Sequence, residues 1–193
     1  TLDEYVLRMK PEQKEIYFIT GERLDAVQHS PYLEKLKEKG YEVLLLTDVV
    51  DEWLTQSLTQ FKEKNMVSIT KEGLNLDSEE EKKQKEIVKK AQLERFGSLI
   101  EKIKTTLTDN VKDVVISDRL TETPVCLVSA EHEMSANMQK ILSKMGEGLG
   151  KESKRILEIN PNHLIFEAML NGNEDQVKNW SEILYNQALL TEG

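Results

Sequence analysis

The chain of 193 residues has one cysteine, three histidines and no long hydrophobic run. The lone Cys126 excludes an internal disulfide and fits a reducing compartment. Because Cys126 lies in the apolar run PVCLVSA, we expect a buried structural thiol. No stretch approaches the roughly 18 apolar residues that a membrane-spanning helix needs, and the N-terminus lacks the pattern of a signal peptide.

An excess of positive charge is also absent, since the formal net charge is −9. This balance argues against nucleic acid or an anionic membrane surface as the main partner. Hydrophobic residues make up 38% of the chain and charged residues 32%, which is typical of a soluble globular protein. The chain does not begin with Met, so we expect a fragment of a longer, cytoplasmic protein.

The usual catalytic patterns are incomplete. The segment GEGLGKES, residues 146–153, is similar to a phosphate-binding loop, but Met145 and Glu152 occupy positions that require Gly and Ser or Thr. The histidines are too far apart for a metal site, and no acid pair or nucleophilic serine has a suitable context. We therefore expect no enzyme activity, cofactor or metal in this chain. The alternative is a small α/β enzyme or nucleotide-handling domain that uses this turn or the end of a parallel sheet.

Residues 1–72 alternate strands and helices. Short apolar runs predict three strands, at residues 15–20, 41–47 and 65–70. A Ser-Pro pair begins one intervening helix and Gly40 ends it, whereas Asp48 is expected to cap another that runs to Phe61. The strand at 41–47 is apolar on both faces, so helices should cover both of its sides. The alternation predicts a small α/β/α sandwich with a short parallel sheet.

Residues 73–193 follow a different pattern. A capping box formed by Ser78 and Glu81 begins a long helix that is charged at first and then apolar on one side. Further strands and two final helices follow without regular alternation, at residues 111–120, 124–130, 155–160, 161–170 and 174–190. This order favours a mixed α+β domain that ends in helices, with the boundary between the two domains near residues 72–80.

Three of the six methionines lie in one amphipathic stretch, residues 131–150. On a helical wheel, five apolar residues fall within an arc of roughly 100°: Met134, Met138, Ile141, Leu142 and Met145. A helix packed on its own core is the ordinary interpretation of such an arc. Methionine, however, is unbranched and adapts to partners of different shape, as on promiscuous binding surfaces. From the residues alone, a core helix and a partner-binding surface remain equally possible.

The last predicted helix, from about residue 175 to 191, has an apolar arc of roughly 160°, wider than one-sided packing requires. The arc contains Val177, Trp180, Ile183, Leu184, Ala188 and Leu190. Part of it should cover the preceding helix at 161–170. The remainder, with Trp180 or Leu184, is expected to meet the same helix of a second copy in a homodimer.

Several stretches, in order along nearly the whole chain, match one family. The most specific are RMKPEQKEIYFITGE, VLLLTDVVDEW, EMSANM and EINPNH. Together they resemble the heat-shock protein 90 chaperones in their bacterial form. The resemblance implies a dimeric, ATP-driven chaperone whose ATP and Mg²⁺ sites lie outside this chain. Residues 1–72 would be the α/β subdomain that ends the middle domain, and residues 73–193 the C-terminal dimerization domain.

The resemblance also implies roles for the two apolar helices. The helix from Met134 to Met145 would contact client proteins, and Met134 stands where many relatives carry Trp. Family members continue past Gly193 with one more helix that completes the dimer bundle. We therefore expect this chain to form dimers more weakly than a complete protein does.

Overall fold

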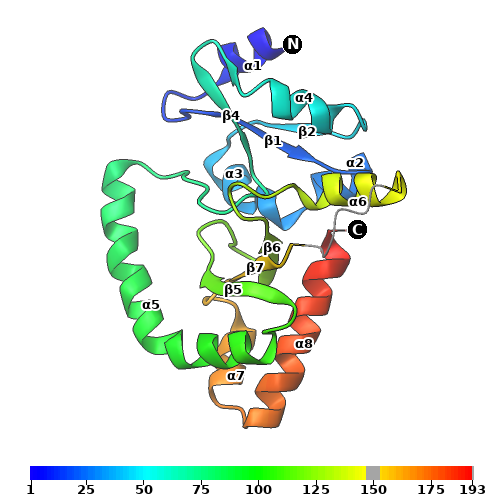
Figure 1. The fold of residues 1–193 in the computed structure, drawn as a ribbon. Coiled ribbons are helices and arrows are strands. Elements are labelled where there is room, and N and C mark those ends of the chain that lie inside the picture. Colours follow the sequence, from blue (N-terminus) through cyan, green and yellow to red (C-terminus); the bar gives the residue numbers. More distant parts are fainter. Residues whose placement is uncertain (147–152, 193) are drawn as a thin grey trace.

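The computed structural model describes residues 1–146 and 153–192, which form two small β-sheets and eight α-helices (Figure 1). The mixture of helices and sheets agrees with the prediction. The first module, residues 1–72, contains a sheet in the order β2-β1-β4-β3. Its strands are β1 (Ile16–Thr20), β2 (Val43–Leu46), β3 (Gln60–Phe61) and β4 (Lys64–Ser68). Its helices are α1 (Leu2–Arg8), α2 (Leu24–Gln28), the 3₁₀ turn η1 (Pro31–Leu33), α3 (Glu34–Lys39) and α4 (Asp51–Ser57).

Local sequence signals account for several of these elements. The β2, β1 and β4 strands are parallel, as predicted. The Ser30 side chain accepts a hydrogen bond from the Tyr32 backbone N–H at the start of η1. Gly40 ends α3 in the left-handed conformation, with φ of 64°, which an L side chain rarely adopts. The caps expected at Ser30 and Gly40 are therefore confirmed.

The prediction of one helix from Asp48 to Phe61 was wrong. The α4 helix ends at Ser57, and β3 then pairs antiparallel with β4 through a tight turn. Lys62 and Glu63 in this turn have φ of 46° and 61°. Such turns usually carry Asn or Gly, so no local residue pattern predicted the hairpin. Asp48 is not the cap either, because its backbone N–H donates to the Asp51 carboxylate.

The prediction that helices cover both sides of β2 is confirmed only in part. This strand lies at the edge of the sheet, and all four of its residues are only half-buried. Figure 1 shows α1 and α4 on one side of the sheet and α2 and α3 on the other. The helices are short, so they leave the edge strand less completely covered than its apolar sequence suggested.

The second module, residues 73–193, contains a three-stranded sheet in the order β5-β7-β6. The β5 strand is parallel and β6 antiparallel to the central β7. The elements of the second module are α5 (Glu79–Thr106), β5 (Val111–Ile116), β6 (Val125–Val128), α6 (Ala136–Lys144), β7 (Arg155–Ile159), α7 (Leu164–Leu170) and α8 (Glu174–Thr191). The capping box of Ser78 and Glu81 begins α5 as predicted.

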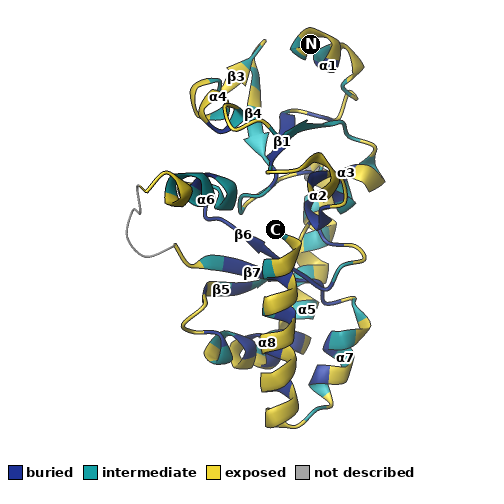
Figure 2. Ribbon diagram, turned by 90° about the vertical axis from the view of Figure 1, so that its right-hand side faces the viewer, coloured by how far each residue is buried: buried dark blue, intermediate teal, exposed yellow. Residues whose placement is uncertain are grey.

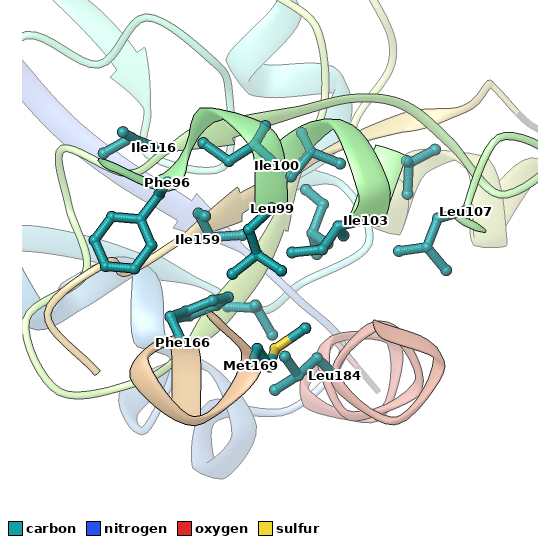
Figure 3. Close-up of a cluster of buried hydrophobic side chains, with 14 of the residues drawn as sticks. Phe96, Leu99, Ile100, Ile103, Leu107, Ile116, Ile159, Phe166, Met169 and Leu184 are labelled. Atoms are coloured by element: carbon teal, nitrogen blue, oxygen red, sulfur yellow. The ribbon is translucent and has the colours of Figure 1, made fainter. Parts of the chain in front are cut away.

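One hydrophobic core fills the space between this sheet and α5, α7 and α8 (Figure 3). Phe96, Leu99 and Ile103 of α5 are at most 3% exposed, and Phe166 of α7 is fully buried. The α5 helix bends along its length (Figure 1). It contains Gly97 followed by Ser98, the kind of pair at which helices often bend. The bend lets the second half of α5 cover the sheet while the first half extends along the outside.

A second core joins the two modules. It combines residues of the first module with residues of the second: Tyr17, Ile19, Val27, Tyr32, Leu33, Leu36 and Ile69 with Leu76, Leu120, Cys126, Val128 and Ile156. The Ser129 N–H donates to Thr70 O, and the Glu72 N–H donates to Ser129 O, so the chain leaving the first sheet runs beside β6. The position of the domain boundary stays a prediction, because packing is continuous across it. Cys126 is buried as predicted, and this burial raises the pKa of its thiol.

Two groups of polar interactions also join the modules at this shared core. The Glu34 carboxylate on α3 accepts hydrogen bonds from the backbone N–H groups of Thr121, Glu122 and Thr123, at 2.6, 2.9 and 3.1 Å. The Arg119 guanidinium donates to Lys71 O at 2.7 Å and pairs with Glu158 at 2.9 Å. Both partners of that ion pair are less than one-tenth exposed, so each compensates the cost of burying the other.

Candidate functional site

The methionine-rich helix α6 lies against the first module. Its first turn is held by the Glu52 carboxylate on α4, which is only 4% exposed. The Ser135 hydroxyl donates to Glu52 Oε2 at 2.9 Å, and the Asn137 side-chain amide donates to Glu52 Oε1 at 2.8 Å. Ser135 also caps the helix by accepting from the Met138 N–H. One buried carboxylate therefore fixes both the start and the position of α6.

The turn before α6 is fixed by a lysine from the segment that follows β4. The Lys71 ammonium donates to three carbonyl oxygens, of Ala130, Glu131 and Glu133. Burial lowers the pKa of Lys71, although nearby carboxylates act in the opposite direction. At the other end of the helix, Lys144 pairs with Glu22. Both ends of α6 are therefore bound to the first module.

The five predicted client-binding residues differ in their exposure. Met134 and Met145 are 45% and 62% exposed, whereas Ile141 and Leu142 are half-buried. Met138 is only 7% exposed. The expectation that Met138 faces solvent is therefore wrong. Two of the three methionines remain available to a partner.

A groove of about 550 Å³ runs between α6 and the loop that follows β2. Ile141 and Met145 line one side of it, and Val49 lines the other. Figures 1 and 2 place α4 and α6 on the same side of the molecule. We call the apolar residues of this region the α4–α6 surface, which consists of Val49, Val50, Trp53, Leu54, Met134, Ile141 and Met145.

The contribution of α4 to this surface was missed at the level of sequence. Val50, Trp53 and Leu54 recur at helical spacing, a pattern that predicts a helix but does not show whether these residues are buried. In the structure they are 65%, 39% and 48% exposed, and the buried residue of α4 is the polar Glu52. No signal in the sequence separates Glu52 from the neighbouring Asp48 and Asp51, although a buried carboxylate requires hydrogen-bond donors from elsewhere in the fold.

The predicted dimer helix α8 divides its apolar arc between two environments (Figure 2). Val177, Leu184 and Ala188 are at most 4% exposed and belong to the core of their own chain. Figure 3 shows Leu184 beside Met169 of α7. These three residues are therefore not available as interface residues in this structure, which corrects the prediction. Trp180 and Ile183 are 40% and 52% exposed, and with Leu190 they form an outward apolar stripe.

Other candidate sites receive little support. Most of the glycine-rich segment predicted at 146–153 lies outside the described residues, since residues 147–152 are not described. Among the residues that are described, no group of three or more His, Cys, Asp or Glu side chains is arranged to hold a metal ion. In the same part of the chain, no helix combines the length and the apolar character required to cross a bilayer.

Comparison with known proteins identifies the class to which this fold and these surfaces belong. The family described as "Hsp90 protein" matches residues 1–193. The chain therefore belongs to the Hsp90 family, as the resemblance of its short segments indicated.

Individual relatives agree with this assignment. The chain is 57% identical to the chaperone protein HtpG of Bdellovibrio bacteriovorus, over all of the chain and 31% of that protein. It is 43% and 45% identical to the proteins of the same name from Geobacter sulfurreducens and Nitrosomonas europaea, over all of the chain and 30% of each. The chain thus spans about three-tenths of the length of these relatives.

Proposed function

We propose that this chain is part of an ATP-dependent molecular chaperone, in which it binds partly folded client proteins and forms a homodimer. The α4–α6 surface is the observation that carries this proposal. Val49, Ile141 and Met145 line one groove, and a monomeric protein rarely exposes apolar side chains together in this way unless they bind something. Methionine side chains suit partners of varied shape, and the groove beside them offers an apolar lining.

The remaining parts of the proposal follow from the family. In the full-length protein, ATP and Mg²⁺ would bind outside residues 1–193, and hydrolysis would be coupled to protein folding in the cytoplasm. The first module would be the small α/β/α subdomain that ends the middle domain, and the second module the C-terminal dimerization domain. The acidic net charge supports proteins, rather than nucleic acids or membranes, as partners.

Client binding can be tested with exposed residues alone. Met134→Ser combined with Met145→Ser should weaken the suppression of aggregation of a heat-denatured model protein. Because both side chains are largely exposed, the free energy of unfolding should change by less than about 0.5 kcal/mol per residue. Aggregation is followed by light scattering, and stability by urea denaturation.

A matched control removes two exposed apolar residues elsewhere. Leu7 on α1 and Ile87 on α5 are 84% and 74% exposed, so Leu7→Ser with Ile87→Ser makes a similar chemical change. This control should suppress aggregation as well as the unmodified chain. Equal loss of activity in both double variants would show that general surface hydrophobicity, rather than the α4–α6 surface, binds the client. Met138 is left unchanged, because truncating a buried methionine lowers the free energy of unfolding by about 2–5 kcal/mol. A loss of stability could then not be distinguished from a loss of client binding.

A further inference from the structure

The outer side of strand β2 has no neighbouring strand. β2 lies at the end of the sheet order β2-β1-β4-β3, and its inner side pairs in parallel with β1. The Gly21 N–H donates to Leu46 O at 3.1 Å, so the Leu46 carbonyl points toward β1. Because backbone groups alternate in direction along an extended strand, the N–H groups of Val43, Leu45 and Thr47 point away from β1. In the described part of the chain, these three N–H groups have no hydrogen-bond partner.

This open edge lacks most of the features that usually protect an edge strand. Edge strands often carry a proline, a charged side chain or a bulge, each of which prevents another chain from pairing. The β2 sequence is VLLL, and its register with β1 is regular. All four side chains are only half-buried, and the length of four residues is the one protective feature. The edge therefore presents unpaired backbone donors and acceptors between apolar side chains on both faces, which suits an extended apolar polypeptide.

The same edge continues into the groove beside α6. Thr47, the residue after β2, lines this groove with Val49, and Ile141 and Met145 line its α6 side. An unfolded segment that pairs with β2 can therefore extend past Thr47 to the α4–α6 surface. A second copy of this chain fits less well, because its own edge of four residues is about 13 Å long. A contact of that length alone falls far short of the roughly 1,200 Å² that stable interfaces bury.

We propose that β2 binds an extended, apolar segment of a client protein by adding it to the sheet as a further strand. The inference rests on the proposed client binding and specifies which segments are bound. The backbone of the segment pairs with Val43 and Leu45, and its side chains lie beside apolar neighbours on both faces of the sheet. Strands that are buried on both faces in folded proteins are near-continuous runs of Val, Ile and Leu. Such runs are exposed before a client has folded, and they are the segments that fit this edge.

The test uses the peptide KKVVIVVKK, acetylated and amidated at its ends, with the chain of residues 1–193. Its control is the same peptide with an N-methyl group on every apolar residue, which keeps the charge and the side chains but prevents strand pairing. The unmodified peptide should shift the backbone amide resonances of Val43, Leu45 and Thr47 saturably and slow their hydrogen exchange. The methylated peptide should bind at least about tenfold more weakly, because the backbone hydrogen bonds are lost.

A matched pair of variants locates the binding edge. Thr47→Pro removes one outward N–H and should weaken binding of the unmodified peptide by about fivefold or more. Thr47→Ala keeps this N–H and should bind the peptide normally. Proline is tolerated where the N–H of an edge strand faces solvent, so the fold should be retained, which circular dichroism checks. If Thr47→Pro does not fold, the comparison of the two peptides still decides.

Three results would overturn the proposal: equal binding of the two peptides, equal binding by the two folded variants, or no saturable shift at Val43 and Leu45. Exchange of these amides that slows when the chain is concentrated without peptide would show that a second copy occupies the edge, and would also overturn it. The measurements involve no aggregating client and leave Met134 and Met145 unchanged. Failure here is therefore distinct from failure of the proposed function, which the methionine variants test.

Discussion

At the scale of single residues, Glu34 shows how one carboxylate can join two modules. Burial raises the pKa of its carboxyl group, but hydrogen bonds from Thr123, Glu122 and Thr121 outweigh this effect and hold the pKa below its ordinary value. A carboxyl group whose pKa is lowered by folding stabilises the protein above its unfolded-state pKa. That contribution is lost as the pH falls through the lower, folded-state pKa.

Glu34→Gln should therefore lower the free energy of unfolding at neutral pH by about 1–2 kcal/mol, because the amide carries no charge and keeps only one acceptor oxygen for these donors. The difference from the unmodified chain should shrink as the pH falls below about 4.3, the ordinary pKa of glutamate, because the unfolded state then takes up a proton before the folded state does. Urea denaturation across this pH range measures the loss of stability at neutral pH and its decrease at low pH. Glu38→Gln on the same helix is the control, since its ion pair with Lys35 is exposed and should contribute less than about 1 kcal/mol. An effect of Glu34→Gln that does not vary with pH would contradict this account.

At the scale of elements, two adjacent residues of α8 should have different roles. One should contribute to the stability of the fold and the other to self-association. Leu184→Ala removes a core side chain and should lower the free energy of unfolding by about 2–5 kcal/mol. Ile183→Ala removes an exposed one and should leave that value within about 0.5 kcal/mol. Ile183→Ala should instead weaken self-association, which sedimentation over a dilution series detects. If Ile183→Ala associates as strongly as the unmodified chain, the outward stripe is not the interface.

The same helix shows which structural features can be predicted from the sequence. Periodicity located the helix and its wide apolar arc, because both depend on local spacing. The spacing alone could not show which residues of the arc are buried in their own chain. The burial of Leu184 and the exposure of Trp180 depend on where α7 and the sheet lie. The same limit applies to α6, whose amphipathic pattern was clear. The position of α6 depends on Glu52 of α4, which is more than 80 residues away along the chain.

Elements with strong local signals were predicted best. The cap at Ser78 and the left-handed Gly40 follow from the chemistry of a few neighbouring atoms. The hairpin at Lys62 and Glu63 has no such signal, because neither residue favours a positive φ. Similarly, Glu52 looked like one acidic residue among many. Only the assembled fold brings Ser135 and Asn137 to its carboxylate.

At the scale of the whole molecule, the shared core should make the two modules unfold together. The chain has two tryptophans, Trp53 on α4 of the first module and Trp180 on α8 of the second. Trp180→Phe leaves the first as the only reporter, and Trp53→Phe leaves the second. In each variant, the urea midpoint measured by tryptophan fluorescence should equal the urea midpoint measured by circular dichroism. A lower midpoint for the Trp53 signal alone would show that the first module unfolds independently.

The core that spans the two modules also has a consequence for the order of events during synthesis. The first module is complete in sequence at residue 72, yet Tyr32 and Leu36 pack in one cluster with Val128 and Ile156. Domains made early on the ribosome usually fold before the rest of the chain appears. Here the apolar side of the first module has to wait until about 80 further residues have been made, between Glu72 and Ile156. During that interval the nascent chain exposes the kind of surface that chaperones bind.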